Sequence, residues 1–364
     1  MFSVLRFLSL SSISLFLPSC VTPPPISSER DPASLQAHSK VILVIIDGVR
    51  RLELEGKAKD DKGHSVAMEN VFPSLSEMKK SGVFYSEMKI SNPAGISLPA
   101  YSDIFAGRRQ ERIVTNSPIF SDFRSHYPTI FEIVKTELNL APNGVGLFSS
   151  WEKLCQIATQ ERRSTKGEFF KSCGWQKGKY AKAEVFDESR ADSDTFVEFI
   201  RELPKRHPIL SVVHLGDADD EAHQEHDIET SSHVHYGIFH YHQALRADDY
   251  YVGRIRELID TDPFYKGTTY LFVTTDHGRD NVPDPNQWCN HGSCRKHNNG
   301  ELCSGCTASF LLAVGPGLKA HSIDRVVSHT DIAPTIAALL GVPMPSATGK
   351  PLEEIASAVI ASTE

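Results

Sequence analysis

The chain has 364 residues, of which 40% are hydrophobic and 23% are charged, and its formal net charge is −8 at pH 7. This is the composition of a soluble globular protein with a sizeable core, so it excludes a mostly disordered chain. The acidic balance argues against a nucleic-acid polymer as partner, because such binding faces need clustered Lys and Arg. One domain is expected, since large α/β enzymes often keep this length around one sheet.

The first residues are typical of a bacterial export signal. Arg6 precedes an apolar run over residues 7–17, which is too short to span a bilayer as a helix. The run ends in Leu17-Pro18-Ser19-Cys20, which resembles a lipobox. We therefore expect residues 1–19 to be a lipoprotein-type signal peptide. A lipid on Cys20 would anchor the exported chain in a bacterial membrane, facing the periplasm or the cell surface, with plain secretion as the alternative.

A low-complexity segment follows the signal. Residues 20–39 contain three consecutive prolines and many Ser and charged residues, so they cannot bury enough apolar surface to fold. This composition predicts a disordered tether, and residues 40–364 then form a single catalytic domain.

Six cysteines remain besides Cys20, an even number in a chain expected to reach an oxidising compartment. Proximity suggests a disulfide between Cys155 and Cys173. The other four could pair among themselves or hold a structural zinc ion, and export favours disulfides. These four are Cys289, Cys294, Cys303 and Cys306.

Apolar, largely β-branched runs alternate with helical patterns along the domain. The runs cover residues 40–46, 209–215, 269–275 and 309–314. Helical patterns cover residues 129–138 and 191–203. Continuous apolar runs suit strands that are covered on both faces. The alternation predicts an α/β fold with a doubly wound, mostly parallel central sheet and helices on both faces.

A further helix is expected near the C-terminus. Thr330 or Asp331 can cap it, Pro334 suits its first turn, and Gly341 ends it. Ile332, Ile336, Leu339 and Leu340 share one face of this helix.

Acidic and imidazole side chains directly follow three of the apolar runs. Asp47 follows the first run, Asp219 and His223 follow the second, and Asp276 and His277 follow the third. Each Asp alone could simply cap the next helix. Because the carboxyl ends of parallel strands meet at one edge of a sheet, the coincidence predicts a site for a divalent metal such as zinc or manganese.

Four short motifs occur in a defined order along the chain. They are Asp47-Gly48, Ser97-Leu98-Pro99-Ala100-Tyr101, Asp219-Asp220-Glu221-Ala222-His223 and Asp276-His277-Gly278. In this order they resemble the alkaline phosphatase superfamily, most closely its type I phosphodiesterase and nucleotide pyrophosphatase branch. The resemblance extends from Lys40 to about Leu352 and implies an alkaline phosphatase-like fold.

The resemblance implies two divalent metal ions, Zn²⁺ first and Mn²⁺ as the alternative. One ion would be held by Asp47, Asp276, His277 and the Ser97 oxygen. The second would be held by Asp219, His223 and His291. His291 ranks first as the last ligand because several relatives place theirs between the Asp-His-Gly motif and the next strand. His329 and His297 are the alternatives.

The resemblance also implies that Ser97 is the nucleophile. Two adjacent cations lower the pKa of a coordinated hydroxyl, so Ser97 would attack phosphorus and form a phosphoseryl intermediate that water then hydrolyses. On local sequence alone, Ser97 could be a turn hydroxyl ahead of Pro99. Ser102 is the alternative nucleophile.

Two departures from the relatives bear on the reaction. Ala100 stands where the pyrophosphatases have an Asn that binds a phosphoryl oxygen, so Asn92, Asn116 or a backbone amide must supply that donor. Sulfatases convert a Cys or Ser to formylglycine within CxPxR or SxPxR, whereas here the fifth position is Tyr101. Asp47 is also a single Asp where sulfatases typically have a pair. An unmodified serine favours phosphate over sulfate.

The segment from His223 to His242 is rich in histidine, but only His223 stands in the Asp-x-x-x-His register. The others are interpreted as surface residues or neighbours of ligands: His226, His233, His235, His240 and His242.

Three functions remain open. The first is metal-dependent hydrolysis of a small phosphorylated substrate, as a phosphomonoesterase or phosphodiesterase. The second is a phosphotransferase, phosphomutase or sulfatase-like hydrolase on the same fold. The third is a surface lipoprotein that binds metal without catalysis.

Overall fold

The computed structural model describes residues 29–117, 124–160, 168–174, 189–223, 231–279, 291–292 and 303–358, with only the backbone of 231–237. Several predictions lie outside these residues: the signal peptide, the Cys20 anchor, His226, Cys289, Cys294 and His297. Within the described part, no helix combines the length and apolar character needed to cross a bilayer.

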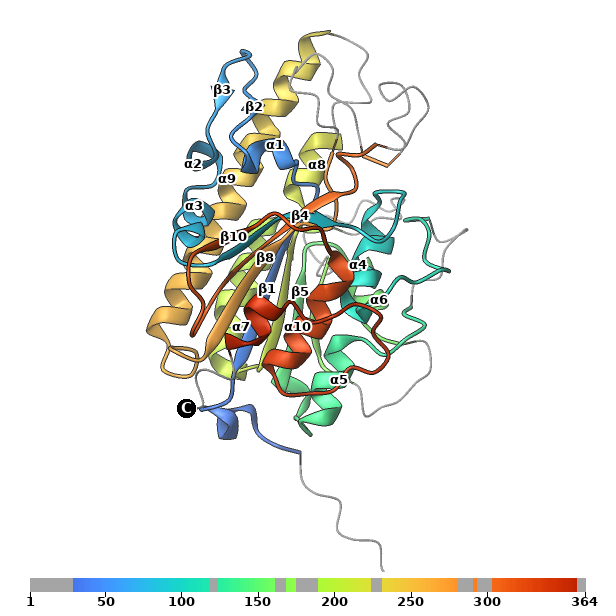
Figure 1. Cartoon of the computed structure of the whole chain (residues 1–364), viewed down its shortest axis with the longest axis vertical. Coiled ribbons are helices and arrows are strands. Elements are labelled where there is room, and N and C mark those ends of the chain that lie inside the picture. Colours follow the sequence, from blue (N-terminus) through green and yellow to red (C-terminus); the bar gives the residue numbers. More distant parts are fainter. Residues whose placement is uncertain are drawn as a thin grey trace, which may run out of the picture.

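The centre of the molecule is a mostly parallel sheet (Figure 1). Strand β1 (Lys40–Ile46) lies between β7 (Leu210–Leu215) and β8 (Thr269–Thr274) and is parallel to both. Beyond β7, β5 (Val145–Ser149) and β6 (Phe170–Cys173) continue the parallel order. Every residue of β1 is buried, as expected for a strand covered on both faces.

The other edge of the sheet is mixed. Strand β9 (Ala308–Val314) is antiparallel both to β8 and to β4 (Val83–Lys89). Two short strands, β10 (His321–Ile323) and β11 (Val327–Ser328), pair in parallel with β4. The sheet thus has nine strands within the described residues, and the predicted doubly wound α/β fold is confirmed.

Helices cover both faces of the sheet (Figure 1). One layer contains α3, α7 and α9, with α9 in contact with both α3 and α7, and the other contains α4, α5, α6 and α10. Their bounds are α3 (Pro73–Lys79), α4 (Ser97–Ala106), α5 (Ile130–Glu137), α6 (Lys153–Ile157), α7 (Asp192–Arg206), α9 (Ser231–Thr261) and α10 (Ile332–Leu339).

Shorter elements complete the chain. They are η1 (Pro32–Leu35), α1 (Arg51–Leu54), β2 (Ala58–Lys59), β3 (Ser65–Val66), α2 (Met68–Val71), η2 (Pro142–Gly144), α8 (Asp217–His223), η5 (His329–Asp331) and α11 (Glu353–Ala356). Among them, α8 begins directly after β7, so it starts at the carboxyl edge of the sheet.

One local prediction was wrong. The disordered tether was predicted to reach residue 39, but Pro32–Leu35 form a 3₁₀ turn capped by Asp31, and Arg30 exchanges backbone hydrogen bonds with Asn139 and Ala141.

The predicted C-terminal helix is present as α10, and Asp331, one of the two predicted caps, is its N-cap residue. The side chain of Asp331 makes no cap hydrogen bond to α10. It accepts a hydrogen bond from the Ser328 N–H at 2.9 Å, because the 3₁₀ turn η5, which Ser328 caps, precedes the helix.

The disulfide prediction is confirmed where the structure describes the cysteines. Cys155 is bonded to Cys173, and Cys303 is bonded to Cys306. Because the last two sulfurs are joined to each other, they are not thiolate ligands, and the alternative of a four-cysteine zinc site is wrong.

Candidate metal centre

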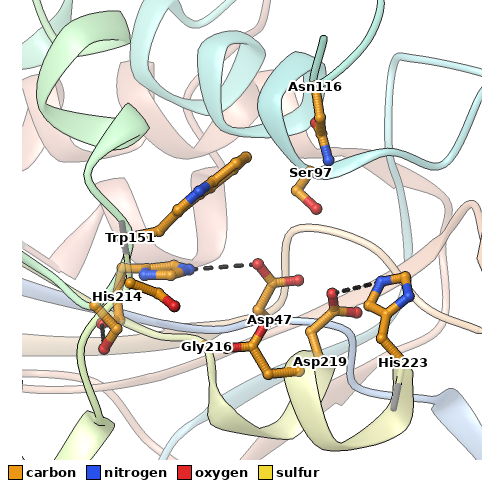
Figure 2. Close-up of a pocket in the computed structure, with 11 residues that line it drawn as sticks. Asp47, Ser97, Asn116, Trp151, His214, Gly216, Asp219 and His223 are labelled. Carbon is orange, nitrogen blue, oxygen red and sulfur yellow. Dashed lines mark hydrogen bonds and ion pairs between the residues drawn. The ribbon is translucent and has the colours of Figure 1, made fainter. Parts of the chain in front are cut away.

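The predicted site residues lie at the carboxyl edge of the sheet (Figure 2). Asp47 follows β1, and Asp276 and His277 follow β8. Asp219 and His223 lie on α8. Because β1, β7 and β8 are parallel neighbours, all these side chains leave the sheet in the same place.

We call Asp47, Asp276 and His277 the buried cluster. The Nε2 atom of His277 lies 3.4 Å from Asp47 Oδ1 and 3.5 Å from Asp276 Oδ2. Asp276 and His277 are fully buried, and Asp47 is 4% exposed. One ligand atom from each residue lies within 4.8 Å of the others, so the three could hold one metal ion.

We call Asp219, His223 and His291 the rim cluster. His223 Nε2 lies 3.0 Å from Asp219 Oδ2 and 3.0 Å from His291 Nε2. His291 Nδ1 lies 2.8 Å from the Gly95 carbonyl oxygen, which accepts its hydrogen bond and directs Nε2 toward the cluster. These three residues also bring ligand atoms within 4.8 Å of one another.

Ser97 and His277 connect the two clusters. His277 Nε2 lies 3.9 Å from Asp219 Oδ1 and 3.1 Å from Ser97 Oγ. Ser97 is the first residue of the ten-residue helix α4, so its hydroxyl lies at the positive end of the helix dipole. The geometry therefore places one hydroxyl beside two groups of potential metal ligands.

Two buried oxygen atoms indicate that the buried cluster fits a cation. Asp47 Oδ1 and Asp276 Oδ2 have no hydrogen-bond partner among the described residues. Burial, together with the nearby carboxylates of Asp47 and Asp219, raises the pKa of Asp276 well above its usual value. Orphaned acceptors and crowded carboxylates are costly in a protein interior unless a cation or a proton neutralises them.

The imidazoles suit the same role. Burial lowers the pKa of His277, although Asp47 and Asp219 oppose this effect. Burial and the proximity of His277 lower the pKa of His291 well below its usual value. Both rings are therefore neutral near pH 7, which is the form that binds metal.

Arg279 is a buried cation beside the rim cluster. Its guanidinium is fully buried, forms an ion pair with Asp219 Oδ1, and donates to the Asp219 carbonyl oxygen at 3.1 Å. Burial raises the pKa of Asp219, but Arg279 and His291 outweigh it, and the pKa lies well below its usual value. Asp219 therefore stays ionised and held in place.

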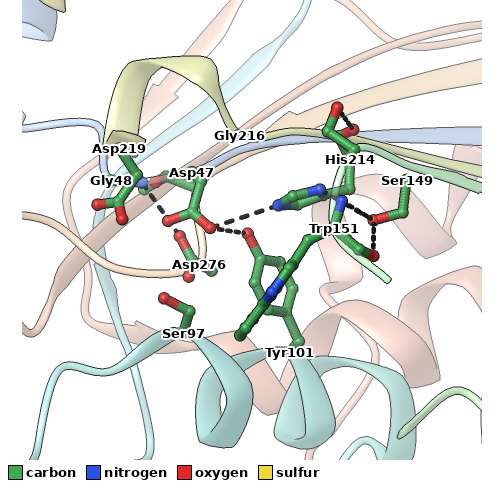
Figure 3. A network of polar contacts seen from close by, with 12 residues as sticks. Asp47, Gly48, Ser97, Tyr101, Ser149, Trp151, His214, Gly216, Asp219 and Asp276 are labelled. Carbon is green, nitrogen blue, oxygen red and sulfur yellow. Dashed lines mark hydrogen bonds and ion pairs between the residues drawn. The ribbon is translucent and has the colours of Figure 1, made fainter. Parts of the chain in front are cut away.

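A polar network orients Asp47 (Figure 3). The Tyr101 hydroxyl donates to Asp47 Oδ2 at 2.8 Å, and His214 Nε2 lies 3.3 Å from the same oxygen. His214 Nδ1 lies 3.0 Å from Ser149 Oγ. With Oδ2 engaged in this way, Oδ1 is the atom that faces His277.

Gly48 allows the clusters to approach each other. Its φ is +69°, a left-handed conformation, and its N–H donates to Asp276 Oδ1 at 3.2 Å. A Cβ atom at this position would lie 2.5 Å from Asp219 Oδ1. Only glycine combines this backbone conformation with so close a carboxylate.

The structure separates the alternatives that the sequence left open. His329 is fully buried and lies outside both clusters. Ser102 is fully buried and its hydroxyl donates to the Pro99 carbonyl oxygen at 2.8 Å, so it is not placed as a nucleophile. Asn116 lines the cavity above the clusters, whereas Asn92 does not.

His242 is not a surface residue. It is 2% exposed, and its Nε2 lies 3.2 Å from Glu53 Oε1. Glu53 also forms an ion pair with Arg50, which follows Asp47 closely in the chain. Through Glu53, His242 thus supports the loop after β1.

A cavity opens above the two clusters (Figure 2). Its volume is about 120 Å³, which is small beside the ~300–1,000 Å³ of sites that enclose a drug-sized ligand. Besides Asp47, Ser97, Asp219 and His223, the lining includes Asn116, Ser150, Trp151, Ser189, His214, Gly216 and Asp220.

Sequence reasoning missed Arg279, His214 and Trp151. Arg279 directly follows the Asp-His-Gly motif, and His214 lies within the strand that precedes Asp219, so both were adjacent to recognised positions. Nothing in the sequence signalled that Trp151 lies beside Ser97, because the two come from different elements.

No protein-family model matches the chain, and no curated protein matches it. Solved structures do share its fold. A phosphonate monoester hydrolase from Silicibacter pomeroyi superposes with a TM-score of 0.59 at 14% identity, covering 88% of this chain and 77% of that one. A 2-O GAG sulfatase gives 0.61 at 12% identity, covering 88% and 74%. A protein in the alkaline phosphatase superfamily from Vibrio parahaemolyticus gives 0.55 at 12% identity, covering 87% and 72%.

Proposed function

This chain has the alkaline phosphatase superfamily fold, and on that basis we propose that it is a metal-dependent hydrolase that cleaves phosphate esters with Ser97 as the nucleophile. The observation that carries the proposal is the position of Ser97 Oγ, which lies 3.1 Å from His277 Nε2 of the buried cluster, in the cavity that Asp219 and His223 of the rim cluster also line. Membership of the type I phosphodiesterase and nucleotide pyrophosphatase branch stays a prediction.

The two clusters and Ser97 would each contribute ligands to a pair of metal ions. Asp47, Asp276, His277 and the Ser97 hydroxyl would hold one divalent ion, and Asp219, His223 and His291 would hold the other, with Zn²⁺ as the first choice. Such a pair of ions, when bound, lowers the pKa of a coordinated hydroxyl and stabilises charge on the attacking and leaving oxygens.

Other groups of the chain bind and orient the phosphoryl group. Asn116 accepts a hydrogen bond from the Leu98 N–H with its Oδ1, at 2.9 Å, so its amide NH₂ is available to donate into the cavity. This supplies the oxyanion donor that Ala100 cannot provide. The N-terminus of α4 adds a favourable dipole for the negative charge at Ser97. Attack of the Ser97 oxygen on phosphorus would break the bond from phosphorus to the ester oxygen, which releases the alcohol and leaves a phosphoseryl intermediate. Water would then attack that intermediate, releasing the phosphate product and restoring the Ser97 hydroxyl.

Sulfate esters are the second candidate, because a sulfatase is among the structures that share the fold. Tyr101 argues against the usual sulfatase chemistry. It stands at the fifth position of the motif, where sulfatases have Arg, and its buried hydroxyl donates to Asp47. An unmodified serine transfers phosphate more readily than sulfate, so phosphate ranks first.

Export and anchoring form a separate part of the proposal. The disulfides within the described residues, Cys155–Cys173 and Cys303–Cys306, suit a protein that matures in an oxidising compartment. We propose that Cys20 carries the lipid that holds the enzyme at a membrane. Labelling cells with an alkyne fatty acid should tag the wild-type chain, and Cys20→Ala should abolish the tag; equal labelling of both would contradict the anchor.

Turnover assays test the catalytic proposal. Zinc-loaded and manganese-loaded protein should hydrolyse p-nitrophenyl phosphate or bis-p-nitrophenyl phosphate faster than p-nitrophenyl sulfate, and Ser97→Ala should abolish hydrolysis. Acid quenching should trap phosphate on the peptide that contains Ser97. Ser102→Ala is the matched control, because that hydroxyl lies in the same helix but is bonded to Pro99.

The outcomes separate the candidates. Faster release from the sulfate ester would favour a sulfatase, and transfer to an added alcohol in place of water would favour a phosphotransferase. No turnover of any ester by metal-replete protein would favour a binding protein.

A further inference from the structure

Trp151 occupies a particular place in the cavity. It follows β5 and lines the same cavity as Ser97, Asn116 and His214 (Figure 2). Its side chain is half-buried, whereas the large aromatic residues of the core, such as Tyr101 and Phe148, are fully buried. Part of the indole surface therefore faces the space that the organic group of an ester would fill.

The backbone of Trp151 is fixed from within the site. The Ser149 hydroxyl donates to the Trp151 carbonyl oxygen at 2.8 Å and accepts from the Trp151 N–H at 3.1 Å. Ser149 also contacts His214, which in turn contacts Asp47. The position of Trp151 is thus tied to that of a predicted metal ligand (Figure 3).

The ring and the following helix are fixed as well. Lys153 Nζ lies 4.7 Å from the centre of the Trp151 ring, a distance that suits a cation–π contact. The Cys155–Cys173 disulfide joins α6 to β6 just beyond it. A ring held in this way loses little conformational freedom when a ligand stacks on it.

The rest of the lining decides what kind of ring would fit. Besides Trp151, the described lining of the cavity is largely polar and includes Ser150, Ser189 and Asp220. A planar aromatic group gains most when it is enclosed by apolar surface on both faces. A pyranose ring instead offers an apolar C–H face to one aromatic wall and hydroxyls to polar side chains at its edge. Asp220 also disfavours a leaving group that carries further negative charge.

We propose that Trp151 forms a subsite that stacks a pyranose ring, so that the natural substrate is an ester of a sugar. This rests on the proposed function, since the subsite is defined relative to Ser97. Ser189 and Asp220 would bind the sugar hydroxyls, and Trp151 would determine specificity rather than take part in the chemistry.

Kinetics on matched esters tests the subsite. The metal-loaded enzyme is assayed with glucose 6-phosphate and glucose 6-sulfate, and with the ringless glycerol 3-phosphate and glycerol 3-sulfate. Trp151→Leu should lower the ratio of kcat/KM for the sugar ester to that for the ringless ester about fivefold to tenfold. Trp151→Phe, which keeps a flat ring, should restore most of the ratio. An equal loss on both esters would show a structural role and overturn the proposal.

A binding measurement separates failure of the subsite from failure of the proposed chemistry. The chain has three Trp residues, so intrinsic fluorescence can report a ligand at one of them. In the metal-loaded Ser97→Ala protein, glucose 6-phosphate should change the fluorescence, and adding Trp151→Phe should abolish the change, whether or not the wild type hydrolyses any ester. No change with glucose 6-phosphate, or a larger one with adenosine 5′-monophosphate, would overturn the sugar subsite.

Discussion

The buried cluster and the rim cluster contain similar ligands but are held by different parts of the fold. Asp47 and Asp276 follow central strands of the sheet. Tyr101 and His214 hold Oδ2 of Asp47, and the Gly48 N–H holds Oδ1 of Asp276. The histidines of the rim cluster lie outside the strands of the sheet. His223 ends the short helix α8, and its side chain is 40% exposed, while His291 is held through the Gly95 carbonyl.

This difference predicts an order of metal affinity. Ligands fixed by core strands need little rearrangement to bind an ion, whereas ligands on connections must be ordered first. We therefore expect the buried cluster to retain its ion under a chelator that strips the rim cluster. Equal release of both ions would remove the basis of the comparison.

The largest effect should come from the buried cluster itself. Asp276→Asn keeps the shape of the side chain but removes a charge from a fully buried position, so kcat/KM should fall about a thousandfold or more, with loss of at least one ion. His223→Asn should cost less activity and only the rim ion. Metal counting by mass spectrometry and steady-state kinetics measure both effects. Asp260→Asn, at an exposed position in α9, is the matched control.

The residues that orient Asp47 should have the next largest effect. Tyr101→Phe and His214→Asn each remove a contact to Asp47 Oδ2 while keeping most of the side-chain volume. The affinity of the buried cluster for Zn²⁺ should fall roughly tenfold to a hundredfold, and that of the rim cluster should change little. Competition with a chromophoric chelator reads out both sites. A loss confined to the rim ion would be inconsistent with this role.

The Cys303–Cys306 disulfide should affect mainly the rim cluster. Gly278 donates to the Cys306 carbonyl oxygen at 3.1 Å, and Gly95 packs against Cys306. Since Gly95 binds His291, reduction of the protein, or the double substitution Cys303→Ser with Cys306→Ser, should lower the occupancy of the rim ion. The pair Cys155→Ser with Cys173→Ser is the control for a general effect of losing a disulfide. Unchanged metal content after complete reduction would refute the link.

The smallest effect on the metals should come from His329. Burial lowers the pKa of His329 to about 3, and neither ring nitrogen has a hydrogen-bond partner among the described residues. Below its ordinary pKa of 6.5 the unfolded chain binds a proton that the folded chain does not. Between pH 6.5 and 3, stability should therefore fall with decreasing pH by up to about 1.4 kcal/mol per unit from this residue.

His329→Phe tests this account of His329. Urea unfolding of the chelated wild type and variant across this pH range should show a flatter profile for the variant. The variant should still bind two ions per chain. If it lost one, His329 would be a ligand, and the rim cluster would need to be redefined.

Much of the fold could be predicted because buried strands appear in the sequence as continuous apolar runs. The apolar runs that became β1, β7 and β8 gave the parallel core, and polar residues at their ends gave the common edge. The direction of β9 was not predictable from its run, because a buried strand has the same composition whether it is parallel or antiparallel. Likewise, Ser328 caps η5 because a 3₁₀ turn precedes α10, which periodicity does not show.

Some residues of the site could be predicted from the sequence, and others could not. Asp47, Asp219 and Asp276 come together because strand ends converge, and this could be predicted from order alone. Arg279 and Trp151 depend on how side chains of separate elements pack, which no local pattern contains.

Gly48 sets a limit on how this protein can vary. Because Gly48 has no side chain, Asp219 can lie close to its backbone. Even one added methyl group would displace the Asp219 carboxylate. A saturation library at this codon should therefore yield active clones only with the original residue. Any redesign of this protein must keep Gly48 and change residues in the walls of the cavity instead.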